Sequence, residues 1–252
     1  MDYGLYVAAS GAHTQNQRME VLSHNLANVD TPGFKSEMAV LKARHTRAIQ
    51  DGTDITGSRG LNDLGSGVEM KETTTDFSPG LTKQTAQKWD VAIQGEGFFR
   101  VQDAATGRQL LTRAGNFQVN ALGELRTPQG FQVLDSAGTP IVMNPDMHSM
   151  VHKDGFVEHS GGGQYLSIAK PRSLGDLVRV GENTFRSIGP LAELGPGEKG
   201  VEPGFLEVSS VKPTEAMMEL IETSRMYEAN VRMIQHHDQM TGSLVNRILR
   251  SQ

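Results

Sequence analysis

The first thirty residues carry an apolar repeat whose members are separated by alternating steps of three and four. Between residues 5 and 29 only Gln15 interrupts it, and its apolar members are Leu5, Ala8, Ala12, Met19, Leu22, Leu26 and Val29. A repeat of about 3.5 residues is typical of a helix that presents a narrow seam to another helix. We therefore expect a helix over residues 1–31, which ends because Pro32 lacks an N–H donor and Gly33 permits a turn.

The C-terminal part of the chain carries the same spacing over a longer stretch, after Pro213, which suits a first helical turn. The apolar members are Met217, Leu220, Tyr227, Val231, Ile234, Val245 and Ile248. Ser224, Asp238 and Thr241 interrupt this stripe, so it is less regular than the first. We expect a helix over residues 209–252, whose methionines give a flexible apolar surface for unlike neighbours.

Seams as narrow as these bury little surface against a sheet. We therefore expect the terminal helices to form a coiled-coil-like stalk and to pair with other copies of the chain. On this interpretation, the apolar members of both repeats are subunit-interface residues. The alternative that periodicity leaves open is a pair of amphipathic helices packed on one globular domain.

The middle of the chain has a β-like pattern. Residues 32–67 are predicted to be a connecting loop or extended segment, and residues 68–208 to be one inserted antiparallel β domain. Turns recur about every ten residues, and Gly107, Gly123 and Gly138 lie where a tight reversal needs a positive φ. The expected fold class is α+β, with terminal helices around a single all-β insert.

Composition argues against several classes of function. The formal net charge is −5, from 24 basic and 29 acidic residues that form no basic stripe for nucleic acid. No run approaches the ~18 apolar residues of a spanning helix, and we expect no conventional secretory signal at the N-terminus. The lack of cysteine removes disulfides and thiolate metal sites. We expect neither nucleic acid nor a small-molecule substrate as a partner.

No candidate site for chemistry completes a known pattern. Gly95-Glu96-Gly97 follows a strand-like run, but Arg100 replaces the last glycine of a dinucleotide motif, so a turn is the better interpretation. His148, His152 and His159 lie near acidic residues, in a spacing that is not diagnostic of a metal site. Nucleophile-elbow, zinc-protease and Walker motifs are absent. We therefore expect no enzyme activity and no catalytic, cofactor or metal site.

Residues 25–35 contain the pattern Asn-x-Ala-Asn-x-x-Thr-x-Gly-[Phe/Tyr]-[Lys/Arg], by which the chain resembles bacterial flagellar rod and hook proteins. The signature residues are Asn25, Ala27, Asn28, Thr31, Gly33, Phe34 and Lys35. Residues 90–99, 112–117 and 225–230 are similar to the same family. The resemblance therefore extends over nearly the whole chain.

The resemblance implies a structural subunit of the flagellar basal-body rod, in the periplasm, exported uncleaved by the flagellar type III apparatus. Such a subunit polymerises helically through its terminal helices and forms part of the drive shaft and export channel. The implied partners are other copies, other rod proteins and the export apparatus. One β insert resembles the proximal or the distal rod type, and residues 77–81 and 88–90 favour the proximal one. A hook-type subunit, a soluble adaptor and a cell-wall hydrolase remain the alternatives.

Overall fold

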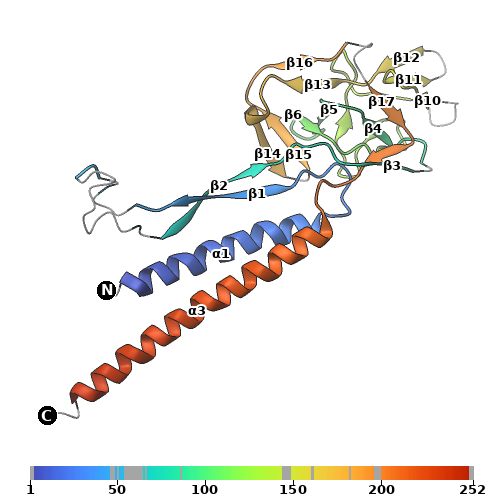
Figure 1. The fold of residues 1–252 in the computed structure, drawn as a ribbon. Helices are drawn as coiled ribbons and strands as arrows, with labels where there is room; N and C mark the ends of the chain where they lie inside the picture. The colour runs from blue at the N-terminus through green and yellow to red at the C-terminus, as the bar shows by residue number, and fades with distance from the viewer. Residues whose placement is uncertain are drawn as a thin grey trace. The chain divides into compact units, whose positions relative to one another are not determined.

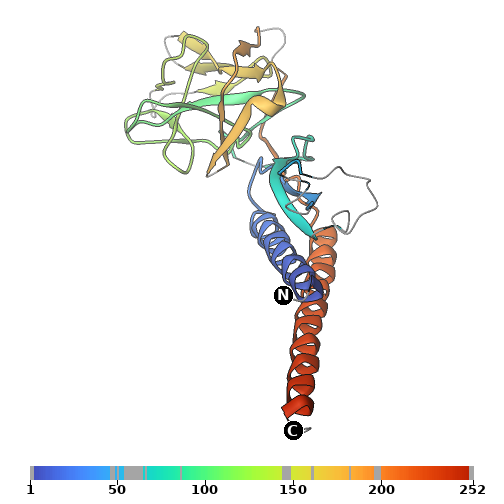
Figure 2. The same cartoon turned by 90° about the vertical axis from the view of Figure 1, so that its left-hand side faces the viewer.

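The computed structural model describes residues 3–45, 49, 51–53, 65, 67–85, 87–143, 149–159, 162–181, 183–195 and 200–249. The chain divides into two compact units (Figure 1, Figure 2). We call residues 1–27, 37–76 and 212–252 the helical unit, and residues 28–36 and 77–211 the β unit. The chain therefore passes from one unit to the other after residues 27, 36, 76 and 211.

The helical unit contains the helices that were predicted at the two ends of the chain. α1 (Tyr3–Ala27) and α3 (Pro213–Leu249) lie side by side (Figure 1). β1 (Glu37–Ala43) and β2 (Val68–Thr75) form an antiparallel ribbon that packs on α1. β1 falls within the range expected as a connecting segment, and most of the Gly- and Ser-rich stretch before Gly67 lies outside the described residues. In the part of the chain that the structure describes, neither terminal helix combines the length and the hydropathy of a membrane-spanning helix.

The β unit is built of short antiparallel strands. Its largest sheet runs in the order β14 (Leu177–Gly181), β15 (Thr184–Ser187), β6 (Gln109–Thr112), β5 (Phe98–Gln102), β9 (Gln132–Val133), β8 (Leu125–Arg126) and β7 (Gln118–Val119). β13 (Ile168–Pro171) pairs with β5 and with β16 (Leu191–Glu193). A 3-10 turn, η2 (Leu174–Asp176), precedes β14.

Smaller sheets complete the β unit. One contains β10 (Met150–Val151), β11 (Phe156–His159) and β12 (Gly162–Tyr165). The pairs β4 (Val91–Ile93) with β17 (Val201–Pro203) and β3 (Thr82–Gln84) with β18 (Phe205–Glu207) join early and late parts of the unit. The last part of the β unit is therefore held beside its beginning.

The core of the β unit lies on both faces of β5. Phe99 and Val101 belong to the larger hydrophobic cluster, where the Phe99 and Phe117 rings meet edge to face at 5.0 Å between centroids. Phe98 points to the opposite face, because successive strand residues alternate, and it packs with Leu111 and Phe185. β5 is thus apolar on two sides, which explains its run of hydrophobic residues.

The predicted α+β class is confirmed, with a helix at each end and an antiparallel β-rich middle. The predicted turn glycines Gly107, Gly123 and Gly138 have φ values of 68°, 81° and 81°. The sheet is not a simple meander, since β5 pairs with β9 and β13 as well as with β6. Such long-range pairings leave no local signal, and strands β14 to β17 were not separated from turns by their sequence.

Candidate functional site

α1 and α3 pack against each other within the chain. A Cβ added to Gly4 would lie 2.9 Å from Nε2 of His237, and one added to Gly11 would lie 3.1 Å from Oδ1 of Asn230. This order makes the helices antiparallel. The seam residues that are buried or half-buried are Leu5, Ala8, Ala12, Met19, Leu22 and Leu26 on α1, with Leu220, Tyr227, Val231 and Ile234 on α3. Small residues near the start of α1 allow the close approach.

The other predicted interface residues lie elsewhere. Val29 follows the end of α1 and belongs to the residues of the β unit, where it is half-buried. Met217 and Val245 are exposed on α3. The side chain of Ile248 lies outside what the structure describes.

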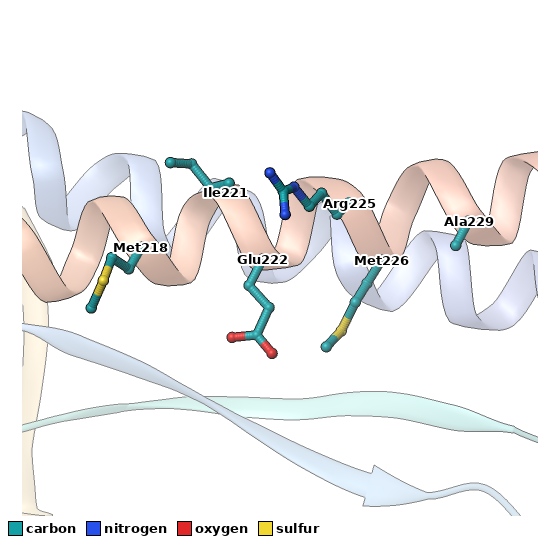
Figure 3. Close-up of a pocket in the computed structure, with 6 residues that line it drawn as sticks. All are labelled: Met218, Ile221, Glu222, Arg225, Met226 and Ala229. Carbon is teal, nitrogen blue, oxygen red and sulfur yellow. The ribbon is translucent and has the colours of Figure 1, made fainter.

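A second apolar stripe on α3 is exposed. Met226, Met233 and Met240 recur at intervals of seven, and all three are exposed. Around Met226 the helix surface forms a shallow groove of ≈ 400 Å³. Its lining residues are Met218, Ile221, Glu222, Arg225, Met226 and Ala229. Met218, Glu222 and Met226 project from the same side of the helix (Figure 3). α3 therefore carries one seam covered by α1 and one that is open.

The end of α3 extends past α1 within the helical unit. Gly4, close to the start of α1, is level with His237, but α3 continues to Leu249 (Figure 2). Met240 and Leu244 in this extension are more than half exposed. Exposed apolar residues on the part of a helix that extends beyond its partner helix form a surface suited to binding another protein.

The signature residue Asn25 fixes the ribbon to α1. Its Nδ2 donates to the carbonyl of Glu37 at 2.7 Å, and its Oδ1 accepts from the N–H of Glu37 at 2.9 Å. Further along α1, Thr14 and Ser10 both donate to the carbonyl of Val68, at 2.7 and 3.0 Å. α1 thus has an apolar side toward α3 and hydroxyl and amide groups toward the strands. Ala27, the next signature residue, ends the helix.

The signature residues 28–35 dock into the β unit. Thr31 donates to Oδ1 of Asn28 at 3.2 Å, which closes a turn after α1. Gly33 has φ of 66°, and a Cβ added there would lie 2.4 Å from the carbonyl carbon of Arg113. Phe34 is buried beneath the guanidinium of Arg179, which lies 4.7 Å from the ring centroid. Glycine is required at position 33 because the chain passes directly against another backbone segment.

Lys35 enters a buried cluster of charges. Its ammonium lies 2.6 Å from Oε1 of Glu207 and 2.7 Å from the carbonyl oxygen of Ser78. Arg113 Nη1 lies 3.3 Å from the other oxygen of Glu207. Burial lowers the pKa of the Arg113 guanidinium, whereas the negative charges of Glu207 and Glu96 oppose that shift. The two cations share the carboxylate of Glu207, which lies within 3.3 Å of both.

The histidine cluster that was considered as a metal site is only partly described. His152 Nε2 lies 2.8 Å from Oε2 of Glu158, and His159 Nδ1 lies 2.9 Å from the carbonyl oxygen of Gly162. His148 lies outside the described residues. Within the described part of the chain, no three histidine or acidic residues are grouped as metal ligands. Gly95 and Gly97 both have positive φ, in keeping with a turn.

Sequence reasoning missed the partners of Lys35. Arg113 lies in one of the family-like segments, residues 112–117, but nothing in that segment indicates a link to Lys35. Glu207 lies in a short strand. In the sequence, its charge looks like that of any exposed strand residue. The one available signal for a buried charge was a cation at the end of an otherwise apolar or turn-like segment, Pro-Gly-Phe-Lys.

Comparison with known proteins follows this division of the chain. Residues 5–35 match the family model "Flagella basal body rod protein", and residues 202–247 match "Flagellar basal body rod FlgEFG protein C-terminal". Residues 92–159 match "Flagellar hook protein FlgE/F/G D1 domain". The α1 end, the β unit and the α3 end thus each match the same class, the axial proteins of the flagellar rod and hook.

Relatives match over nearly the whole length. The flagellar basal-body rod protein FlgF of Caulobacter vibrioides is 30% identical, with 98% of each chain covered. FlgG of Buchnera aphidicola subsp. Schizaphis graminum is 33% identical, with 95% of this chain and 97% of the relative covered. FlgF of Salmonella typhimurium is 31% identical, with 96% of each covered. The chain belongs to the flagellar basal-body rod protein family.

Proposed function

We propose that the protein is a structural subunit of the bacterial flagellar basal-body rod, without catalytic activity. The observation that carries this function is the similarity to rod proteins FlgF and FlgG over almost the entire chain. Similarity limited to one unit would support a shared domain only. Here the helices and the β unit are both included, so the role of the rod subunit applies to the whole molecule.

The terminal helices are the proposed polymerisation surface, acting together as a coiled-coil-like stalk. The covered seam holds α1 to α3, which leaves the stripe of Met226, Met233 and Met240 for neighbouring subunits. A contact between this stripe and a different surface of the next copy is heterologous, and it generates an open helical polymer when the rotation between copies does not close a ring. Flexible methionine side chains suit a surface that meets both like and unlike rod subunits.

The proposed partners are other copies, other rod proteins and the flagellar type III export apparatus, which would deliver the chain to the periplasmic rod. The proximal type is our first proposal, because residues 77–81 and 88–90 depart from the distal pattern. The distal type is the second, because FlgG relatives reach 33% identity. Fractionating basal bodies from strains arrested at successive stages of rod assembly separates the two by the stage at which the protein first appears.

The test of the polymerisation surface is a pair of matched substitutions. Met226→Arg/Met233→Arg places charges on the open stripe, and Met150→Arg places one on the β unit, where Met150 is 51% exposed. Each is introduced into a strain without the chromosomal copy, and rods are imaged in isolated basal bodies. We expect the stripe variant to be exported but to form no complete rod, and the control to assemble. Normal rods from the stripe variant would exclude this surface as the contact.

A further inference from the structure

We propose that residues 28–36 form a latch, a segment that leaves the β unit without unfolding it and whose seating depends on the buried ammonium of Lys35. The latch is a property of the chain by itself and does not depend on the proposed rod function. It contains the part of the signature that lies outside α1.

The latch is separable because the β unit has a core without it. All of residues 28–36 are described, and none of them belongs to a strand. The hydrophobic clusters of the described β unit are assembled from residues between 77 and 201, and Phe34 is in neither. Phe34 instead lies under Arg179, whose guanidinium also stacks on Phe185 at 5.3 Å. Arg179 keeps an aromatic partner when the latch leaves.

Polar contacts seat the latch beside the segment that leads out of the β unit. Gly33 N–H donates to the carbonyl of Glu207 at 2.7 Å, and Ser210 N–H donates to that of Phe34 at 3.0 Å. Ser36 N–H donates to Oγ of Ser210 at 2.9 Å. On the other side, Asn183 Nδ2 donates to the carbonyl of Pro32 at 2.8 Å. Water replaces hydrogen bonds of this kind when the segment detaches.

Lys35 makes seating all-or-none. Its side chain is 1% exposed and meets Glu207, which is 3% exposed. A charge that has left water without reaching its partner is strongly unfavourable, so partly inserted positions of Lys35 are not populated. Arg113 remains at 3.3 Å from Glu207 and continues to compensate the carboxylate when Lys35 withdraws. The site therefore tolerates the release of the latch better than the loss of Glu207.

The position of the latch in the chain gives its release a consequence. The chain enters the β unit after residue 27 and leaves it after residue 36, returning to the helical unit. With the latch released, the chain passes between the units only after residues 76 and 211. Release of the latch therefore lowers the number of points at which the chain passes between the units from four to two, while each unit keeps its own core.

Hydrogen exchange of the full-length protein, read by mass spectrometry at rising urea below the unfolding transition, tests the proposal. We expect the peptide covering residues 28–36 to exchange faster than those covering 97–102 and 132–141. Its exchange rate should hardly respond to urea, because local opening exposes little surface. Equal exchange and equal urea dependence in all three peptides would show that residues 28–36 are an integral part of the β unit.

Lys35→Met tests the role of the charge. The apolar side chain cannot make the ammonium's contacts with Glu207 and with the carbonyl of Ser78, so the seated latch loses both. We expect exchange of residues 28–36 to be accelerated about 100-fold with core peptides almost unchanged. Lys170→Met is the matched control, because the ammonium of Lys170 also pairs with a carboxylate, that of Glu96, but is 50% exposed. A uniform acceleration across the β unit, or none at residues 28–36, would overturn the proposal. If Lys35→Met fails to fold, the urea dependence of hydrogen exchange at residues 28–36 in the unsubstituted protein still shows whether this segment opens separately from the β unit.

Discussion

The ammonium of Lys35 lies 2.6 Å from Oε1 of Glu207, although the two residues are separated by 172 positions. Both side chains are almost completely buried. Glu207 also accepts from the backbone N–H of Gly80 at 2.8 Å, and Arg113 Nη1 lies 3.3 Å from its second oxygen. One carboxylate therefore connects the signature segment with two other parts of the β unit, at Gly80 and at Arg113.

Replacing the carboxylate of Glu207 should lower the free energy of unfolding more than replacing an exposed carboxylate does. Glu207→Gln removes the carboxylate charge that the buried cations Lys35 and Arg113 share, and we expect a loss of about 3–5 kcal/mol in the free energy of unfolding. Glu193→Gln is the control, because Glu193 is 34% exposed and lies 3.9 Å from Arg100. It should cost at most ~1 kcal/mol. Urea unfolding followed by circular dichroism measures both, and similar losses would contradict the dominance of the buried cluster.

At Gly33 a side chain would have two energetic costs, a strained positive φ and a clash with the backbone of Arg113. Gly33→Ala adds a Cβ 2.4 Å from the Arg113 carbonyl carbon at φ of 66°, whereas Gly130→Ala adds one at φ of 95° with nothing within 4 Å. We expect about 1 kcal/mol for the strained φ in Gly130→Ala, and more than ~2 kcal/mol in Gly33→Ala. Thermal unfolding of the two variants gives the comparison. Equal losses would mean that the clash is relieved freely.

The amide of Asn25 satisfies both backbone polar groups of Glu37. In Asn25→Ala they lose these partners, and we expect a destabilisation of about 1–3 kcal/mol. Asn16→Ala on the same helix removes an exposed bond to Glu20 of 2.9 Å and should change stability by less than ~0.5 kcal/mol. Hydrogen exchange at residues 37–43 measures the loss where it arises. Unchanged protection of β1 in Asn25→Ala would show that other contacts hold the ribbon.

The carboxylate of Glu124 contributes to stability only while it is ionised. Hydrogen bonds from Asn120, then from Arg126, hold the pKa of Glu124 below its usual value, with a smaller contribution from Gln132. A lowered pKa in the folded state means that the stabilisation is present above about pH 4.5 and is lost as the pH falls through the folded pKa.

We therefore expect the midpoint of urea unfolding of Glu124→Gln to be lower than that of the unsubstituted protein at pH 7, with the difference shrinking toward pH 3. Glu158→Gln, at an exposed strand position 2.8 Å from His152, provides a control variant measured over the same pH series. A difference between Glu124→Gln and the unsubstituted protein that stayed constant from pH 7 to pH 3 would rule out ionisation as its source.

Patterns with a local cause were predictable from the sequence. The α1 repeat, Pro32 after its end and the turn glycines all act within a few residues, and the structure has the helix and the turns they indicate. The pairing of β5 with β9 and β13 was not predictable, because it is decided by which distant strand fits its edges. The open stripe around Met226 was visible as methionine content, but not as a face distinct from the seam.

The sequence by itself determined that the chain has helical ends, turns at defined glycines and a signature segment between α1 and the strands. A repeat determines which face of a helix is apolar, because geometry within one helix sets it. Only the tertiary structure decided that the α1 seam meets α3 of the same chain and that Lys35 meets Glu207. These are choices of partner, made by packing and by compensation of buried charge between residues that are far apart along the chain.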